Sequence, residues 1–288
     1  MEVLVSYSGG KDSQASLIDA LLKYKRRDVK AVFCDTGWEH PETYRHIKST
    51  TEDLKVDLIT LKSRFDFVSL AKYKKRFPSI MARFCTEELK IKPMIDYVLS
   101  HSESLMIYQG IRASESADRA QMGDECMYFK GYFIPRVTKK GKLVYDTYRK
   151  KEVKEWCTKN DASVFRPEYY KSGQDVIDCI LFAGQRPNIL YQRGHSRVGC
   201  YPCLACQLRE MLMLSKDEEM CCRLRWAEKE VGRSFFAPGY IPQWACANGK
   251  FPSVDEVIKY VTAKNATLDM FEPEEGYSCM SMYHGLCE

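Results

Sequence analysis

The stretch Ser8-Gly9-Gly10-Lys11-Asp12-Ser13 constrains the fold of this chain more than any other feature. An apolar, β-branched run at 3–7 precedes it and predicts a buried strand, while apolar residues at helical spacing follow it over 15–22. The two glycines therefore lie where a strand turns into a helix, and glycine reaches backbone angles that are closed to other residues. Free N–H groups at the start of a helix favour a phosphate. With the charge of Lys11 and the hydroxyls of Ser8 and Ser13, the stretch predicts a phosphate-binding loop at the edge of a sheet.

The next segment repeats the strand-to-helix pattern. A second buried strand is expected at 30–34, and it runs into Asp35-Thr36-Gly37 and a helix that begins near Pro41. A third strand is expected at 56–61 and a fourth at 105–109. Two βαβ units imply a parallel sheet whose ligands lie at the carboxyl ends of the strands, where Asp35 and Ser8 both fall. The expected fold class is therefore α/β, with a doubly wound parallel sheet.

The rest of the chain is expected to be mostly helical. Helices are predicted at about 149–159, 173–183, 207–216, 217–231 and 253–264. Before them, alternating segments at 128–134 and 143–145 predict a β-hairpin that forms a basic flap over the cleft. We expect a nucleotide-binding domain over 1–195 and a cysteine-bearing helical C-terminal extension over 196–288.

The loop at 8–13 lacks both common phosphate-binding signatures, G-x-x-x-x-G-K-S/T and G-x-G-x-x-G. It resembles instead S-G-G-x-D-S, the pyrophosphate loop of the adenine-nucleotide α-hydrolase superfamily, whose fold is Rossmann-like. The resemblance implies an enzyme that cuts ATP between the α and β phosphates and passes AMP to a substrate. One branch of the superfamily, the phosphoadenylylsulfate reductases, binds an adenylylated sulfate at this loop instead.

Further motifs over roughly residues 1–206 resemble those of that branch. They are most similar to the motifs of its DNA phosphorothioation members. They are D-T-G-x-x-x-P-E-T at 35–43, R-x-C with a later lysine at 83–92, G-x-R-x-x-E-S at 110–116, P-N-I-L-Y at 187–191 and G-C-x-P-C at 199–203. The catalytic residues that the resemblance implies are Lys11, Asp12 and Arg112. The nucleotide-binding residues that it implies are Ser8, Gly9, Gly10, Ser13, Asp35, Thr36, Gly37, Lys90 and Gly110.

Three of these residues also have a plain structural explanation. Arg112 could be a surface cation that pairs with Glu115, an ion pair that contributes roughly 0–1 kcal/mol when exposed. Asp35 could cap the helix that begins near Pro41. Lys90 could lie on the polar face of an amphipathic helix.

The chain has 13 cysteines, and three of them, Cys200, Cys203 and Cys206, form C-x2-C-x2-C, a spacing that suits one metal centre. A four-ligand site needs a remote ligand, for which Cys85 is the leading candidate. In iron–sulfur members of the family, a cysteine pair in an R-x-C-C segment joins the later pair to hold a 4Fe–4S cluster. Here Thr86 occupies the second position, so Cys206 or a tail cysteine must substitute. Zinc binding and simple packing in the core are the alternatives.

The charge of the chain is unevenly distributed. The net charge is +5, yet residues 265–288 hold five acidic residues and no Lys or Arg, so the first 264 residues carry about +10. The basic runs are either solvated faces or contacts for the phosphates of DNA or RNA. No apolar run is long enough to cross a bilayer and no signal peptide is evident, so we expect a cytoplasmic protein without a membrane partner.

These features predict an ATP pyrophosphatase that adenylates a substrate, for sulfur transfer to a nucleic acid. It would use ATP, Mg²⁺ and a sulfur-donor protein, and act as a homo-oligomer. The rival is a phosphoadenylylsulfate (PAPS) reductase that releases sulfite and uses a cysteine in a C-terminal E-C-G-I/L-H motif. The tail, His284-Gly285-Leu286-Cys287-Glu288, holds those residue types in another order. A third possibility is a non-catalytic nucleotide- or DNA-binding module.

Overall fold

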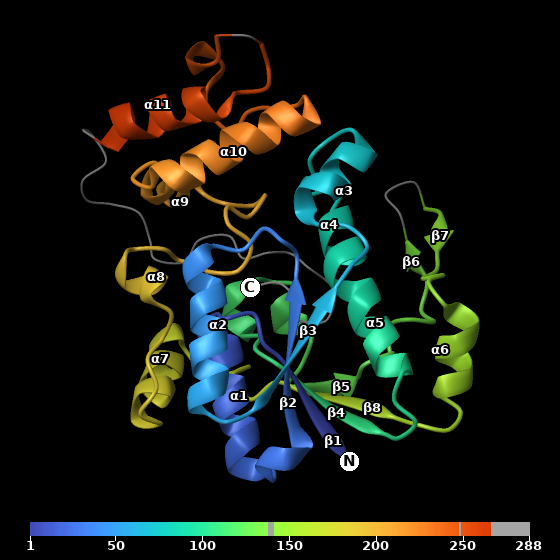
Figure 1. Ribbon diagram of the computed structural model, residues 1–288. Helices are drawn as coiled ribbons and strands as arrows, with labels where there is room; N and C mark the ends of the chain where they lie inside the picture. Colours follow the sequence, from blue (N-terminus) through green and yellow to red (C-terminus); the bar gives the residue numbers. More distant parts are fainter. Residues whose placement is uncertain (138–140, 248, 266–288) are drawn as a thin grey trace.

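The computed structural model describes residues 1–137, 141–247 and 249–265, and a six-stranded sheet lies at its centre (Figure 1). The strands are β1 (Glu2–Ser6), β2 (Val29–Asp35), β3 (Asp57–Lys62), β4 (Leu105–Gln109), β5 (Glu125–Met127) and β8 (Ala162–Phe165). Their order is β3-β2-β1-β4-β8-β5, and every neighbouring pair is parallel except β8 and β5 at the edge. The order in which successive strands join the sheet therefore reverses between β1 and β4, so the loop after β1 lies where a doubly wound sheet binds its ligands.

Helices cover both faces of this sheet, which confirms the expected fold class. On one face lie α1 (Lys11–Lys23), α2 (Pro41–Asp53), α7 (Gly173–Phe182) and α8 (Ile189–Gln192). On the other lie α4 (Phe84–Thr86), a π-helical turn (Glu87–Ile91), α5 (Lys92–Leu99) and α6 (Lys150–Trp156). Alternate residues of β1 supply the two cores, because Val3 packs toward α1 while Leu4 packs toward α5.

A separate helical layer lies above the carboxyl ends of the strands (Figure 1). It consists of α3 (Phe67–Lys74), α9 (Leu208–Leu214), α10 (Glu218–Val231) and α11 (Val254–Asn265). One hydrophobic cluster holds it together, in which Trp38 and Phe67 pack with Leu224 and Phe235. Ring stacking contributes as well, since the centroids of Trp38 and Phe67 are 5.0 Å apart. Among the described helices, none has the length and apolar character needed to cross a membrane.

The predicted hairpin is wrong in its first strand. The observed pair is β6 (Arg136–Val137) with β7 (Leu143–Val144), whereas residues 128–134 form turns. Tyr128, Phe129 and Tyr132 are all buried in the core beneath α5 and α6, so their alternation with smaller residues does not mark an exposed ribbon. The five helices expected in the second half are present within a few residues of their predicted bounds. The short strands β5 and β8 and the helix α3 were not expected.

Candidate functional site

The loop between β1 and α1 has the special backbone conformation predicted for Gly9, whereas Gly10 is extended with a φ of −86°. Gly9 has a φ of +82°, and a Cβ there would lie 2.9 Å from the Cγ1 atom of Ile47, so another residue would be both strained and crowded. The Oγ atoms of Ser8 and Ser13 are 3.1 Å apart, and Ser13 also donates to the carbonyl of Gly10. Within the described ranges, the amides of Gly9 and Gly10 donate to no protein acceptor. The loop therefore presents free N–H groups at the start of a helix, where anions are favoured.

A buried carboxylate organises the cations beside this loop. Asp12 is 1% exposed, and its two oxygens accept hydrogen bonds at 2.7 Å from Lys11 Nζ and from Arg112 Nε. Arg112 is therefore held mainly by Asp12. It also pairs with Glu115, whose Oε1 is 4.0 Å from its Nη2, but both side chains are largely buried, so Arg112 is not a surface cation. Because one negative charge lies between two positive ones, this trio keeps a net positive charge.

Gly110 explains how Arg112 comes so close to the loop. A Cβ on Gly110 would lie 2.4 Å from the backbone N of Ser13 and 2.5 Å from the carbonyl C of Asp12. Only glycine lets the end of β4 touch the start of α1 at this distance. The N-terminus of α7 reaches the same place, since the Cβ position of Gly173 is 3.7 Å from Arg112 Nη1.

Asp35 lies at the end of β2 and does not cap the helix α2. That role belongs to His40, whose Nδ1 accepts a hydrogen bond from the amide of Glu42. Asp35 instead accepts hydrogen bonds from the Tyr44 hydroxyl at 2.7 Å and the Gly37 amide at 2.9 Å, and Lys62 Nζ lies 3.1 Å away. Burial alone would raise the pKa of Asp35, but these donors together hold it below its ordinary value.

Glu39 forms a second buried centre next to Asp35. It is 2% exposed and accepts hydrogen bonds from the hydroxyls of Thr36 at 2.7 Å and Tyr44 at 2.9 Å. The Sγ atom of Cys200 is 3.8 Å from its Oε1. Glu39 precedes α2, where an acid complements the helix dipole, but the fold buries it among these hydrogen-bond donors.

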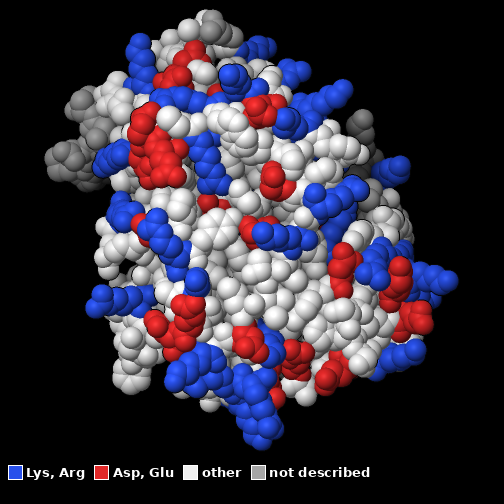
Figure 2. All heavy atoms as spheres, viewed as in Figure 1, with Lys and Arg blue, Asp and Glu red and all other residues white. Residues whose placement is uncertain are grey.

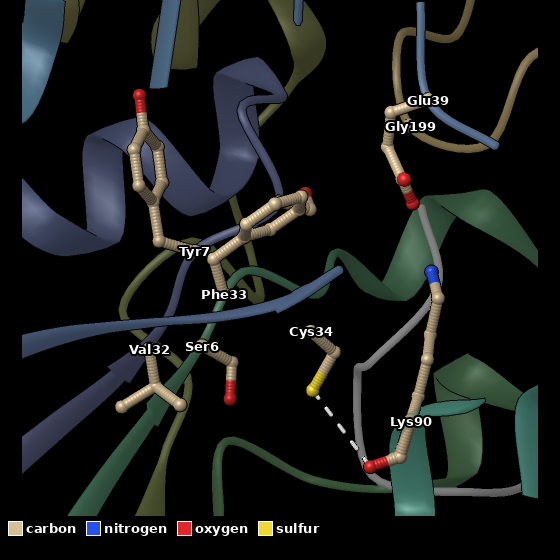
Figure 3. A pocket seen from close by; sticks show the side chains of 9 residues that line it. Ser6, Tyr7, Val32, Phe33, Cys34, Glu39, Lys90 and Gly199 are labelled. Carbon is tan, nitrogen blue, oxygen red and sulfur yellow. Dashed lines mark hydrogen bonds between the residues drawn. The ribbon is translucent and has the colours of Figure 1, made fainter. Parts of the chain in front are cut away.

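A small pocket of about 20 Å³ lies between Glu39 and the loop after β1 (Figure 3). Its walls are the ends of β1 and β2, the loop residue Ser8, and the side chains of Glu39 and Lys90. Lys90 comes from the π-helical turn, is 7% exposed, and points toward Glu39 from the opposite wall. It is therefore not part of a solvated polar face.

The four cysteines predicted as metal ligands do not come together as a ligand set. In the described part of the chain, no group of three or more His, Cys, Asp or Glu side chains is arranged to hold a metal ion. Cys200 faces Glu39, whereas Cys206 is buried with its Sγ 3.5 Å from the Tyr240 hydroxyl. Burial raises the pKa of the Cys206 thiol well above its ordinary value. Cys85 and Cys200 border the same hydrophobic cluster that contains Cys206. As placed, these residues do not fit a 4Fe–4S cluster or a zinc ion.

Four residues at the site were not predicted to act there. The Tyr191 hydroxyl accepts a hydrogen bond from the Lys11 amide at 3.0 Å, and Asn188 donates to the Gly9 carbonyl at 3.4 Å. Arg223 donates to the carbonyls of Gly37 and Glu39 and lies 4.3 Å from the Trp38 ring. The P-N-I-L-Y motif contains Asn188 and Tyr191, so it was a usable signal for these two residues. Glu39 occupies an unspecified position of D-T-G-x-x-x-P-E-T, so that motif gave no signal for it. Arg223, in α10, carried none.

A family model for the phosphoadenosine phosphosulfate reductase domain matches residues 2–206. An uncharacterised protein of Methanocaldococcus jannaschii is 27% identical, over 75% of this chain and 38% of that protein. The chain therefore spans well under half the length of this archaeal relative. An uncharacterised 37.8 kDa protein of Escherichia phage 186 is 26% identical, over 99% of this chain and 96% of that protein.

Solved structures with a similar fold include enzymes of three kinds. The phosphoadenylyl-sulfate reductase of Candida auris, in its phosphate complex, has a TM-score of 0.44 and 15% identity over 70% of this chain and 82% of that chain. The FMN adenylyltransferase of Candida glabrata, with FAD and pyrophosphate, has a TM-score of 0.45 and 16% identity over 69% of this chain and 55% of that chain. The U34-tRNA thiolase of Methanococcus maripaludis, with its 4Fe–4S cluster, has a TM-score of 0.38 and 14% identity over 100% of this chain and 83% of that chain.

Proposed function

The chain belongs to the phosphoadenosine phosphosulfate reductase domain family, and we propose that it is an enzyme that binds ATP at the 8–13 loop and transfers AMP to an acceptor. The observation that carries this proposal is the buried Asp12 carboxylate, which holds Lys11 and Arg112 beside a loop with free amides. Such an arrangement suits a polyanion, because its donors and cations are in place before the ligand arrives.

The phosphates define the reaction that this arrangement favours. The β and γ phosphates lie against the amides of Gly9 and Gly10, with Lys11 and Arg112 at their side. An acceptor oxygen attacks the α phosphorus, its bond to that phosphorus forms, and the bond from the α phosphorus to the bridging oxygen breaks. The electron pair leaves with pyrophosphate, whose developing charge is stabilised by the two cations and the helix N-terminus. The products are adenylated acceptor and pyrophosphate.

The nucleoside would enter beside the loop, where the pocket of about 20 Å³ has to widen to admit a purine. Ser8 and Gly199 border this pocket, and the buried side chains of Glu39 and Lys90 supply the polar groups that a nucleoside would meet there. Asp35 and Thr36 lie at the end of the adjacent strand, with the Thr36 hydroxyl 3.7 Å from Cys200 Sγ. Sulfur delivered to this end of the pocket by a donor protein would displace AMP from the adenylated acceptor. We propose a nucleic acid as that acceptor.

Magnesium is a common companion of ATP in such reactions. The carboxylate nearest the loop does not suit it here, because both oxygens of Asp12 are engaged by cations. The oxygens of Asp35 are likewise engaged, by Tyr44, Gly37 and Lys62. We therefore assign no step to Mg²⁺.

The test is to incubate the full chain with radiolabelled ATP and candidate nucleic acid acceptors and to identify the products. Pyrophosphate and adenylated acceptor are the expected products, with AMP released once a sulfur donor is added, and ADP with orthophosphate would contradict the proposal. The family match also favours a second function, the reduction of PAPS. Its test is to supply PAPS with a thioredoxin system and look for sulfite. Sulfite that is lost in Cys287→Ser would establish the reductase; Cys287 and Cys279 lie outside the described residues.

The cysteine spacing still supports the proposal of a metal centre held by Cys85, Cys200, Cys203 and Cys206, which requires the four thiols to move together when the metal binds. We expect Cys200→Ser and Cys203→Ser each to lose bound iron or zinc and some stability, because metal affinity is coupled to folding. Metal analysis and the visible spectrum of anaerobically purified protein measure this. The matched control is Cys222→Ser, an exposed cysteine on α10 that should keep the metal. Unchanged metal content in all three variants would assign Cys200 and Cys203 to packing alone.

A further inference from the structure

A large groove opens in the helical layer, separate from the loop that binds phosphate. One wall is the segment after α3 (75–81), the other is the end of α10 with the loop that follows it (228–240), and residues 204–206 form part of the floor. Its volume is about 1280 Å³. Small-molecule pockets are usually roughly 300–1,000 Å³. The groove is therefore somewhat larger than the usual small-molecule pocket.

The rim of this groove is basic. Its lining includes five cations against two carboxylates, Glu228 and Asp255. Both carboxylates are already engaged, since Glu228 accepts hydrogen bonds from the amides of Phe235 and Val254, and Asp255 pairs with Arg225 at 2.7 Å. The other four cations have no carboxylate within 4.0 Å among the residues that the structure describes; they are Lys75, Arg76, Lys229 and Arg233. Figure 2 shows Lys and Arg side chains, interspersed with Asp and Glu, over the upper part of the molecule, where Figure 1 places α3, α10 and α11.

The interior of the groove is apolar and aromatic. Phe251 is 58% exposed, and Ile80 and Met81 on the opposite wall are 56% and 74% exposed. Beneath them the rings of Phe236 and Tyr240 lie with their centroids 4.7 Å apart. Large apolar side chains that are exposed together and bordered by charge usually mark a binding surface.

We propose that this groove binds a single-stranded nucleic acid. The four cations meet the phosphates, and the exposed apolar and aromatic side chains meet base faces, which is how proteins hold single strands without reading their sequence. A duplex hides its base faces, so it could use only the rim. The inference concerns binding and does not rest on the proposed adenylation. The 199–206 segment nevertheless joins the two sites, because Gly199 lines the nucleotide pocket and Leu204 lines the groove.

The test is fluorescence anisotropy of a labelled 12-residue oligo-deoxythymidine with the full chain, repeated with oligo-uridine and with a duplex of equal length. Arg76→Glu with Arg233→Glu should weaken single-strand binding at least tenfold. Losing two phosphate contacts should also reduce the slope of log affinity against log salt by about 1.4. Phe251→Ala should weaken binding about fivefold or more, since stacking contributes roughly 1–3 kcal/mol per base.

The matched control is Lys25→Glu with Arg26→Glu, an equal charge change on the exposed loop between α1 and β2. It should keep affinity within about twofold. An equal loss in this control, or a duplex bound as tightly as the single strand, would overturn the proposal. So would a peptide with the acidic sequence of 266–288 that binds the groove when the oligonucleotides do not. Circular dichroism of each variant excludes unfolding as the cause, and Lys75→Ala with Lys229→Ala offers a milder second pair.

Discussion

Replacement of Lys11 by alanine is expected to lower the release of AMP and pyrophosphate from ATP by roughly 100- to 1,000-fold or more, as the loss of one preorganised charged donor does elsewhere. Lys11 Nζ is the cation that α1 itself places at the loop, 2.7 Å from Asp12 and 5.6 Å from the centre of the Tyr191 ring. Without it, Asp12 keeps one cation, so the charges of the trio cancel and no longer favour the leaving pyrophosphate. Product formation under saturating ATP measures the effect.

A matched variant on the same helix separates this effect from a general loss of charge. Lys23→Ala removes one positive charge at the other end of α1, where Lys23 pairs with Asp19 at 2.9 Å. It should retain activity within about twofold, because an exposed pair contributes little. Full activity in Lys11→Ala would show that the loop does not take part in the reaction, for any acceptor.

The substitution Gly110→Ala is expected to lower the free energy of unfolding by about 3 kcal/mol or more and to abolish nucleotide binding. The added Cβ would lie 2.4 Å from the backbone N of Ser13 and 2.5 Å from the carbonyl C of Asp12. Backbone atoms cannot relieve the clash by a change of rotamer, as a flexible side chain can. The start of α1 would therefore have to move away from β4. That movement would carry Asp12 away from Arg112 and distort the loop. Urea denaturation and equilibrium binding of ATP measure the two effects.

Gly131→Ala is the control, because nothing lies within 4 Å of the Cβ position of Gly131. We expect it to change stability by no more than about 0.5 kcal/mol and to leave ATP binding intact. A Gly110→Ala protein as stable as the wild type would mean that the end of β4 does not approach α1 as closely as described.

Local pattern was enough for much of the fold. The run before Ser8 and the helical spacing after Ser13 each depend on residues close together in the chain, and β1 and α1 occur where these patterns place them. The same holds for the start of α2 at Pro41 and for the helices of the second half. The alternation at 128–134 misled because its aromatic side chains are buried in the core, and periodicity alone does not report where a segment is buried.

The sequence by itself determined the phosphate loop, because the glycines, the lysine and the following helix form one continuous segment whose conformation is local. Tertiary structure alone decided the partners of that loop. Arg112 is 100 residues from Asp12, and Tyr191 is 180 residues from Lys11. Their meeting depends on the order of strands in the sheet and on the close approach at Gly110. It also decided that Glu39 is buried beside Cys200, 161 residues away, and that Cys206 faces Tyr240. The spacing of residues along the chain predicts only local structure. Which side chains meet at one site depends on how the strands and helices pack together.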